Sequence, residues 1–541
     1  MQQCHVHRRR SIPLVYLVFL AVGLVLLPFY RFELSPDGIS YVSIATEYAR
    51  GAWSEALNAY WSPLESWLIA VLLLIRIPPI TAAKLVTLAA GVLALASLRR
   101  LLTLLEMSPV IRRLCLFAGA AMALGFVFEE NTPDLLFTAL ILLYLGIIFD
   151  PVYPARRNAG LLCGLIGIFV YLAKAYGFFF FVAHFVLFTA IYWLRSDNRT
   201  RRTFLLRHFL IGSLVFCLGT GIWSTALHAK YGIWTTGTAA NYNFRLVGPE
   251  SDGYPHLRHL IPPPSAHAVN AWQDPLRTAL PSWRITDGSS TIMHELKILT
   301  RNVKLIGGFW YHTTPLWVGC FLGYIVVSLS AASRRLEWAD PLITVLILSA
   351  GYSLVSVESR YFWLTDFLLL WITFRTLDPL VKSSTLTPLA ANTLGWAVTL
   401  SFLIAPILAL RSHFLADKNL YVWSQELKRN PEIKGNLASC ADWPDSAYVA
   451  YQLGLPYYGV TSSTPAAEQV ASDLNPDYHG ATKTRSNIEE IEAALSRAPV
   501  NYLFIWPDCG LVIPGGSETL VTAGNLKLMR LDRGPKNRDR N

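Results

Sequence analysis

The sequence has few charged residues: 15% of its 541 positions, where soluble domains carry about 25%. Apolar residues make up 53% of the chain. They come in long runs, each near the roughly 20 residues that a helix needs to cross a bilayer. The shortage of charge excludes an ordinary soluble protein and indicates an integral membrane protein.

Several catalytic signatures are also missing. The chain contains no glycine-rich phosphate-binding loop, no serine-histidine-aspartate order and no cysteine–histidine cluster with metal-ligand spacing. The formal net charge of +10 does not indicate nucleic acid, because most arginines lie in short loops between apolar runs. That distribution is the positive-inside pattern. We therefore expect membrane lipids, and no nucleic acid, among the partners.

The basic loops predict the topology. Basic residues at 7–10 place the N-terminus in the cytoplasm, before a first span at 12–30. The next basic loop, 99–113, also belongs inside, yet two apolar runs, 63–77 and 80–98, precede it. Two crossings would leave its arginines outside. The shorter run, 63–77, is therefore expected to be a juxtamembrane helix on the outer face.

The later runs alternate in agreement with every basic inner loop, which predicts a mainly α, polytopic bundle of about eleven spans. We expect a multi-pass plasma (inner) membrane protein with a membrane domain over 1–411 and its C-terminal domain outside. The expected spans are 12–30, 80–98, 111–127, 135–149, 159–173, 176–194, 208–227, 312–332, 340–357, 361–377 and 388–410, with a long outer loop at about 228–305.

The tail, 412–541, is polar enough to fold in water. A helical pattern over Ile488–Leu495 and strand patterns over Tyr502–Trp506 and Leu526–Leu531 predict a small extracytoplasmic α/β domain. Of seven cysteines, only Cys440 and Cys509 fall in it. An oxidising compartment would allow a disulfide between them, although the sequence does not fix their separation.

Carboxylates cluster in the first two outer loops. Asp37 follows the first span, and Glu129, Glu130 and Asp134 occupy the second loop. Without a functional role, Asp37 would cap the helix that begins near Ile39, and the second-loop carboxylates would lie in a hydrated loop. The chemical alternatives are a divalent cation held by Asp37, Glu130 and Asp134, or a general base. The sequence leaves the need for a metal open.

Two cations stand at outer span ends, against the positive-inside trend. Lys174 ends one span, and Arg360 lies between Glu358 and Tyr361 at the end of another. Each could simply snorkel to the interface. Together they indicate an anion site, in which arginine clamps a lipid phosphate or pyrophosphate and lysine adds a point charge. Asp366 lies inside a span, where a charge is unusual.

The order of these features resembles a known family. Asp37 after the first span is followed by the aromatic loop 60–67, a short apolar helix, a span that ends in Arg99-Arg100, and a Thr-Pro-Asp-Leu-Leu box at 132–136. The chain is similar to the C-type (GT-C) membrane glycosyltransferases, above all the protein O-mannosyltransferases and lipid A aminoarabinose transferases. The resemblance covers about 12–180 best.

The resemblance implies a hexosyl- or pentosyltransferase that uses a polyprenyl-phosphate-linked sugar and a lipid, glycan or protein acceptor on the outer face. Asp37 and Asp134 would be catalytic, and Lys174 and Arg360 would bind the donor phosphate. The supporting residues would be Tyr41, Glu129, Glu130, Glu358 and Tyr361. The chain departs from the family at Ser62, where aminoarabinose transferases carry lysine, and at the single Asp37, where mannosyltransferases carry an acidic pair.

Two other functions stay open from the sequence. One is a transporter or flippase for a lipid-linked or polar solute, and the other is a non-catalytic envelope scaffold on the same fold. Transporters often show internal repeats and charges at the bilayer midplane. This chain shows no repeat, and only Asp366 lies deep in a span. The pattern therefore favours the transferase.

Overall fold

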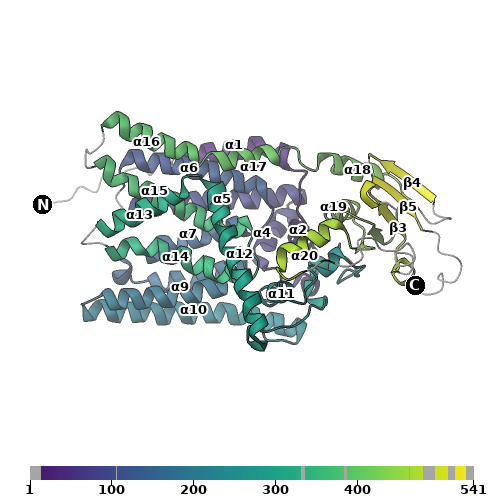
Figure 1. The fold of residues 1–541 in the computed structure, drawn as a ribbon, viewed down its shortest axis with the longest axis horizontal. Coiled ribbons are helices and arrows are strands. Elements are labelled where there is room, and N and C mark those ends of the chain that lie inside the picture. The colour runs from purple at the N-terminus through teal and green to yellow at the C-terminus, as the bar shows by residue number, and fades with distance from the viewer. Residues whose placement is uncertain are drawn as a thin grey trace.

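The computed structural model describes residues 14–104, 107–330, 335–382, 387–461, 463–478, 480, 494–509, 518–524 and 526–531. The expected cytoplasmic N-terminus and most of the helix expected over Ile488–Leu495 lie outside the described residues. Helices run side by side as one long bundle, and a sheet with three helices caps one end (Figure 1). We call the capped end the outer end. The mainly α fold with a small C-terminal α/β region is confirmed.

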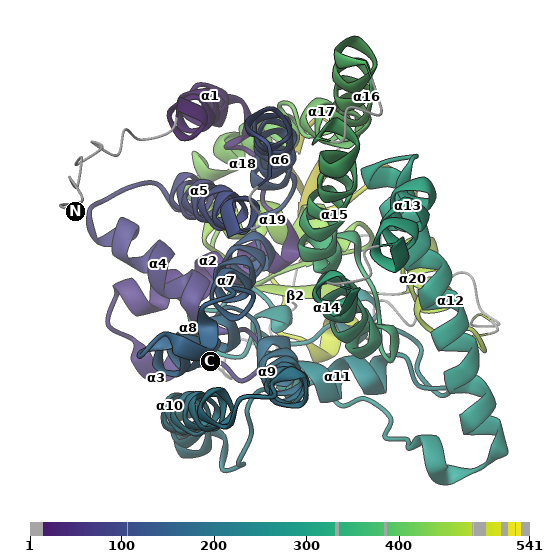
Figure 2. The ribbon, with the colours of Figure 1, turned by 90° about the vertical axis from the view of Figure 1, so that its left-hand side faces the viewer.

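Every expected span falls on a helix, and α16 and α17 share the last one. The helices are α1 (Leu14–Tyr30), α5 (Pro79–Leu104), α6 (Pro109–Glu129), α7 (Asp134–Ile148), α8 (Ala159–Ala173), α9 (Tyr176–Arg195), α10 (Arg199–Tyr231), α13 (Trp317–Ser330), α14 (Arg335–Ser353), α15 (Trp363–Lys382), α16 (Pro388–Ser401) and α17 (Ile404–Ser412). Seen along the bundle, α7 lies near the centre (Figure 2), and 14 of its 15 residues are buried.

Fewer helices than eleven are long and apolar enough to cross a membrane alone. Within the described ranges five qualify, or six if α12 (Ser289–Thr313) and α13, bent by 95°, form one span. The others are short or charged: α7 and α8 have 15 residues each, about 22 Å at 1.5 Å per residue. The chain is a membrane protein, and the count of eleven crossings stays a prediction.

Short helices at the outer end connect the bundle to the C-terminal region. α2 (Pro36–Ala49) packs against α4 (Pro63–Leu74), which is the short apolar helix that the basic loops predicted at 63–77. α3 (Trp53–Ala56) packs against α2, and Tyr242 of α11 (Ala239–Leu246) meets the ring of Tyr60 at 5.4 Å. The expected loop over 228–305 is wrong in part, because it contains most of α12. That helix mixes charged and apolar residues, so it gives no long apolar run.

The first turn of α2 does not use Asp37 as its N-cap, which was one interpretation of the sequence. The helix begins at Pro36, and Ser35 is the N-cap, whose Oγ accepts a hydrogen bond from the Gly38 amide at 3.3 Å. Proline suits the first helical position because its missing amide would have no partner there. Asp37 is therefore not the cap. Its side chain is left for contacts with other segments.

The C-terminal region is a five-stranded mixed sheet in the order β2-β1-β3-β5-β4. The strands are β1 (Leu437–Ser439), β2 (Tyr457–Val460), β3 (Tyr502–Ile505), β4 (Glu518–Ala523) and β5 (Leu526–Arg530), and the helices are α18 (Lys418–Lys428), α19 (Trp443–Leu453) and α20 (Pro465–Leu474). β3 and β5 confirm the expected strands. β1 runs parallel to β2 and β3, whereas β5 is antiparallel to β3 and β4. The boundary at 412 stays a prediction.

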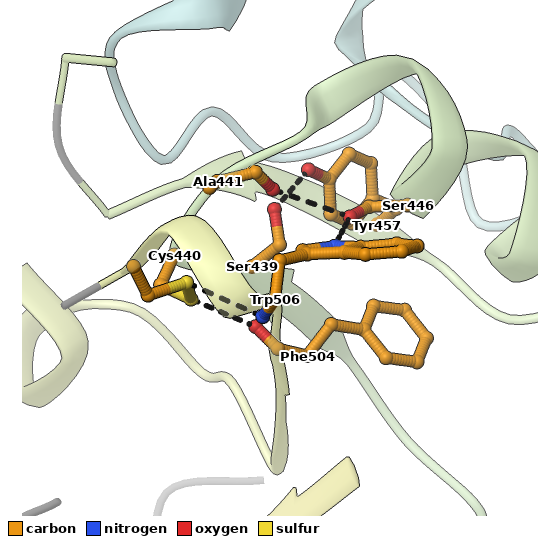
Figure 3. Close-up of a disulfide and its surroundings, with 8 residues drawn as sticks. Ser439, Cys440, Ala441, Ser446, Tyr457, Phe504 and Trp506 are labelled. Carbon is orange, nitrogen blue, oxygen red and sulfur yellow. Dashed lines mark hydrogen bonds between the residues drawn. A yellow bond between two sulfur atoms is a disulfide. The ribbon is translucent and has the colours of Figure 1, made fainter. Parts of the chain in front are cut away.

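A disulfide joins Cys440, just after β1, to Cys509, just after β3, with a Cα–Cα distance of 5.7 Å (Figure 3). The Trp506 indole beside it donates to Ser446 Oγ at 2.8 Å. On the neighbouring strands, the Ser439 and Tyr457 hydroxyls are hydrogen-bonded at 2.6 Å. The disulfide thus links the segments that follow the adjacent parallel strands β1 and β3.

Candidate functional site

A cavity of about 330 Å³ opens at the outer end of the bundle, and it brings together the residues predicted from distant loops. Asp37 comes from α2, Asp134 from the start of α7, Lys174 from the break between α8 and α9, and Arg360 from the turn before α15. Tyr41 and Tyr361 also line it. Concave sites with apolar walls and a few converging polar groups are typical of ligand binding.

Arg360 is the centre of the charged network. One of its terminal nitrogens, Nη2, lies 2.6 Å from Asp37 Oδ2 and 2.6 Å from Glu358 Oε2. Glu130 and Asp134 are at 3.8 Å and 3.9 Å from its other nitrogens. Burial opposes the charge of the guanidinium, but Glu358 and Asp37 outweigh it and raise the pKa of Arg360. Its buried Nε has no hydrogen-bond partner, so one donor is still available.

Lys174 and Asp134 form a second, adjoining pair. The ammonium group of Lys174 donates to Asp134 Oδ1, and Thr132 Oγ1 donates to Asp134 Oδ2 at 2.8 Å. Lys174 Nζ also lies 3.6 Å from the centre of the Tyr361 ring, a cation–π contact. Burial lowers the pKa of Lys174, and Asp134 opposes that shift. Asp134 is only 3% exposed, so this carboxylate is more fully buried than that of Asp37, which is 20% exposed.

Trp272 is a site residue that could not be predicted from the sequence. Its indole Nε1 donates to Asp37 Oδ1 at 2.8 Å, opposite the oxygen held by Arg360. The Trp61 indole donates to the Trp272 carbonyl at 3.0 Å, and Asn58 Nδ2 donates to the Gln273 carbonyl at 2.6 Å. The long outer loop is therefore fastened over Asp37. It has no periodic pattern, and only the fold brings its tryptophan to α2.

Aromatic rings form much of the cavity wall. Tyr41 meets Trp61 edge to face at 5.0 Å, and Tyr352 stacks on Tyr361 at 4.8 Å. Burial raises the pKa of Tyr41, so its phenol stays protonated and can donate a hydrogen bond. Tyr361 already donates to Glu358 Oε1 at 3.0 Å. The walls are thus largely apolar, with hydroxyl groups at defined points.

The carboxylates do not form a metal site. Within the described residues no group of three histidine, cysteine, aspartate or glutamate side chains could hold an ion. Arg360 lies among Asp37, Glu130 and Asp134, where a cation would have to sit. Of the second-loop carboxylates, Asp134 lines the cavity, whereas Glu129 and Glu130 do not. The divalent cation considered from the sequence therefore does not fit, and we assign no step to it.

Carboxylates outnumber cations around Arg360 and Lys174, although Glu130 and Glu358 do not themselves line the cavity. Four carboxylates, from Asp37, Glu130, Asp134 and Glu358, surround two cations, which would leave two excess negative charges if all were ionised. Burial raises the pKa of Glu130, although Arg360 opposes the shift. Glu130 is thus more easily protonated than an ordinary glutamate. The partly exposed Glu358, at 42%, is the partner most easily displaced from Arg360 by an incoming anion.

Asp366 lies apart from this cavity. Its Oδ1 accepts a hydrogen bond from Thr313 Oγ1 at 2.8 Å. This partner could not be identified from the sequence. The side chain is 5% exposed and does not line the cavity. The hydroxyl partner accounts for a polar group inside a span without a functional role.

Comparisons with known protein families and with curated protein sequences find no match. Comparison with solved structures finds the same fold. ArnT from Cupriavidus metallidurans matches in its apo state with a TM-score of 0.56 and 15% identity, and bound to undecaprenyl phosphate with 0.55 and 14%. Both alignments cover 95% of this chain and 97% of that chain. The archaeal oligosaccharyltransferase AglB from Archaeoglobus fulgidus aligns with a TM-score of 0.47 and 10% identity, over 91% of this chain and 69% of that chain.

The likeness to ArnT extends over nearly the whole chain, including the C-terminal region. The protein therefore has the fold of a C-type (GT-C) membrane glycosyltransferase, as the sequence resemblance predicted. At these identities the comparison establishes the fold, and the chemistry has to be argued from the cavity.

Proposed function

We propose that the protein is a membrane glycosyltransferase that moves a sugar from a polyprenyl-phosphate donor to an acceptor on the outer face of the membrane. One observation carries this: Asp37 shares a single outer cavity with Lys174 and Arg360. The fold supports it, because ArnT, which has the same fold, was solved with undecaprenyl phosphate bound. The proposal puts the N-terminus in the cytoplasm and the C-terminal domain outside the plasma (inner) membrane.

Lys174 and Arg360 would hold the donor phosphate. Arg360 has an unpaired Nε and can release Glu358, so it can offer two donors to a phosphate in the bidentate manner that guanidinium favours. Lys174 adds a second positive charge beside Arg360, because both cations adjoin Asp134. As the bond between the sugar and the phosphate breaks, negative charge grows on the leaving oxygen. Cations already fixed in place stabilise that charge without reorganising.

Asp37 would act as the general base. An acceptor hydroxyl or amine attacks the anomeric carbon of the donor sugar, and the carbon–oxygen bond to the phosphate breaks. The lipid phosphate leaves with the electron pair, while the acceptor proton passes to an oxygen of Asp37. Trp272 and Arg360 fix the orientation of this carboxylate. Asp134, more deeply buried, positions Lys174.

The other residues predicted from the sequence would support this arrangement. Glu130 and Glu358 hold the Arg360 guanidinium, and Tyr361 packs under Lys174. Tyr41 offers a phenol beside Asp37. The sugar, a hexose or pentose, and the lipid, glycan or protein acceptor are left open by this geometry.

Asp37→Asn tests the assignment. The full chain is reconstituted in proteoliposomes with a panel of undecaprenyl-phosphate-linked sugars, and radiolabel transferred to envelope extract is counted. We expect the variant to lose about 1,000-fold or more of the transfer, because an amide cannot take the proton. Asp252→Asn, an exposed aspartate away from the cavity, is the matched control and should keep full transfer.

Full transfer by Asp37→Asn would refute the catalytic role. Movement of the lipid-linked sugar across the membrane by both proteins, with no glycosyl product, would support a flippase instead. A wild-type protein that transfers nothing from any donor in the panel would support the scaffold.

A further inference from the structure

A second, larger cavity of about 780 Å³ lies on the other side of α2. One wall is the later part of α2, another is formed by α18 and the end of α19, and the start of α5 closes the membrane side. No residue lines both this cavity and the one that holds Asp37. It is therefore a separate cavity between the bundle and the C-terminal region.

Its α2 wall carries buried polar atoms without partners. Ser43 and Glu47 are spaced one helical turn apart, are 5% and 1% exposed, and line the cavity. Neither Ser43 Oγ nor Glu47 Oε2 has a hydrogen-bond partner. Unpaired buried polar atoms destabilise a fold, so native proteins rarely keep them without a ligand or water to complete them. These two atoms would be satisfied by a ligand that both donates and accepts hydrogen bonds.

The rest of the lining adds positive charge and aromatic surface. The exposed cations around the cavity are Arg31, just after α1, Arg50, the C-cap of α2, and Lys428, the last residue of α18. Tyr421 and Tyr451 present rings from the C-terminal region. Cations of this density attract an anionic group, while the hydroxyl and carboxylate on α2 match a ligand rich in hydroxyl groups.

We propose that this cavity binds a saccharide that carries an anionic group, either free or as the headgroup of a glycolipid. Glu47 lies ten residues beyond Asp37 along α2, about 15 Å at 1.5 Å per residue, so the bound saccharide is not the one that reacts. The proposal stands independently of the transferase assignment, because it concerns binding in the absence of a donor. In a transferase the site would hold a part of the acceptor remote from the reacting atom.

Calorimetric titration of the full chain in phosphatidylcholine nanodiscs tests this, with glucose 6-phosphate as the probe and glucose and inorganic phosphate as comparators. Glucose 6-phosphate is expected to bind more tightly than either comparator. Lys428→Ala should weaken its binding about tenfold. Arg429→Ala removes an equally exposed neighbouring cation that does not line the cavity, and it should leave the affinity unchanged. Ser43→Ala should weaken glucose 6-phosphate and glucose alike.

A second experiment distinguishes a glycolipid headgroup from a soluble saccharide as the ligand. Nanodiscs that contain glucuronosyl diacylglycerol should suppress glucose 6-phosphate binding if a glycolipid headgroup occupies the site, and should not if the ligand is a soluble saccharide. Three results would overturn the proposal: no heat of binding, equal affinity for inorganic phosphate and glucose 6-phosphate, or equal losses in Lys428→Ala and Arg429→Ala.

Discussion

Arg360 is the residue on which the outer carboxylates converge. Its guanidinium reaches Asp37 and Glu358 directly, and lies within 3.9 Å of Asp134. A guanidinium can serve several partners at once because its donors point in fixed, diverging directions, whereas an ammonium is a single compact charge. Arginine at this position therefore both orders the empty cavity and leaves a donor for a phosphate.

A second charged contact at residue scale gives a pH prediction. His413 Nδ1 lies 2.7 Å from Glu33 Oε1, which fastens the end of the last span to the first outer loop. The hydrogen bond that His413 donates to Glu33 raises the pKa of His413, and burial opposes this shift. Glu129 adds to the rise, and Lys84 counters it. The fold therefore favours the charged form of His413 relative to the unfolded chain.

Because the folded pKa is raised, this stabilisation is complete below the unfolded value of about 6.5 and is lost as the pH rises through the folded value. Thermal unfolding of wild type, His413→Gln, Glu33→Gln and the double variant should give a coupling on the order of 1 kcal/mol near pH 6. Near pH 9 the coupling should approach zero. A coupling that grows with pH would contradict this assignment.

At the scale of elements, the close approach of α2 to the loop between α6 and α7 sets the cavity. A methyl group added at Gly38 would lie 2.8 Å from a Leu34 methyl, 3.1 Å from Asn131 Cβ and 3.3 Å from the Asn131 carbonyl. Gly38 is thus needed for packing, not for a tight turn. That packing places Asp37 beside the loop that carries Asp134.

Gly38→Ala should push the two segments apart and reduce sugar transfer about tenfold or more, since misplacing catalytic groups by about 1 Å can cost 100-fold. Expression and thermal stability should fall only slightly. Gly308→Ala, where an added methyl meets nothing within 4 Å, is the control. Unchanged transfer in Gly38→Ala would show that the position of α2 does not limit the reaction.

The elements also show how far the sequence could predict the structure. Long apolar runs and basic loops were enough to locate the bundle helices and α4, and the outer charges Asp37, Asp134, Lys174 and Arg360 do meet in one cavity. α12 was missed because it mixes polar and apolar residues. β1 was missed because three residues carry no readable alternation.

The site itself was only partly predictable. Charged residues against the positive-inside trend revealed the cations, whereas Trp272 reaches Asp37 across 235 positions through tertiary packing alone. Neither Glu129 nor Glu130 lines the cavity, although Glu130 comes within 3.8 Å of Arg360.

At the scale of the whole molecule, the C-terminal region covers the outer end and shares its core with the outer loops. The Ile261 amide donates to the Tyr458 carbonyl at 2.6 Å, and the Tyr457 amide donates to the Val269 carbonyl at 2.7 Å. β2 is thus bonded to the same loop that carries Trp272. Loosening the sheet should therefore disturb the loop over Asp37.

The disulfide offers a way to loosen it. Cys440 and Cys509 are 69 positions apart, and closing a loop of that length stabilises a fold by about 4 kcal/mol in the chain-entropy treatment. Replacing both cysteines with serine should lower the unfolding temperature in scanning fluorimetry and speed proteolysis of the C-terminal region. Dithiothreitol should do the same to wild type and nothing further to the double variant. Equal stability with and without reductant would contradict a disulfide that supports the fold.

The central claim is that Lys174 and Arg360 form a binding site for a polyprenyl phosphate. Its most direct test is an electron cryomicroscopy map of the full chain in nanodiscs loaded with undecaprenyl phosphate. We predict phosphate density about 3 Å from Lys174 Nζ and from the Arg360 guanidinium, with Glu358 displaced. The density should vanish in a Lys174→Met, Arg360→Met double variant. Phosphate density elsewhere on the protein, or density in this cavity that survives both substitutions, would contradict the claim.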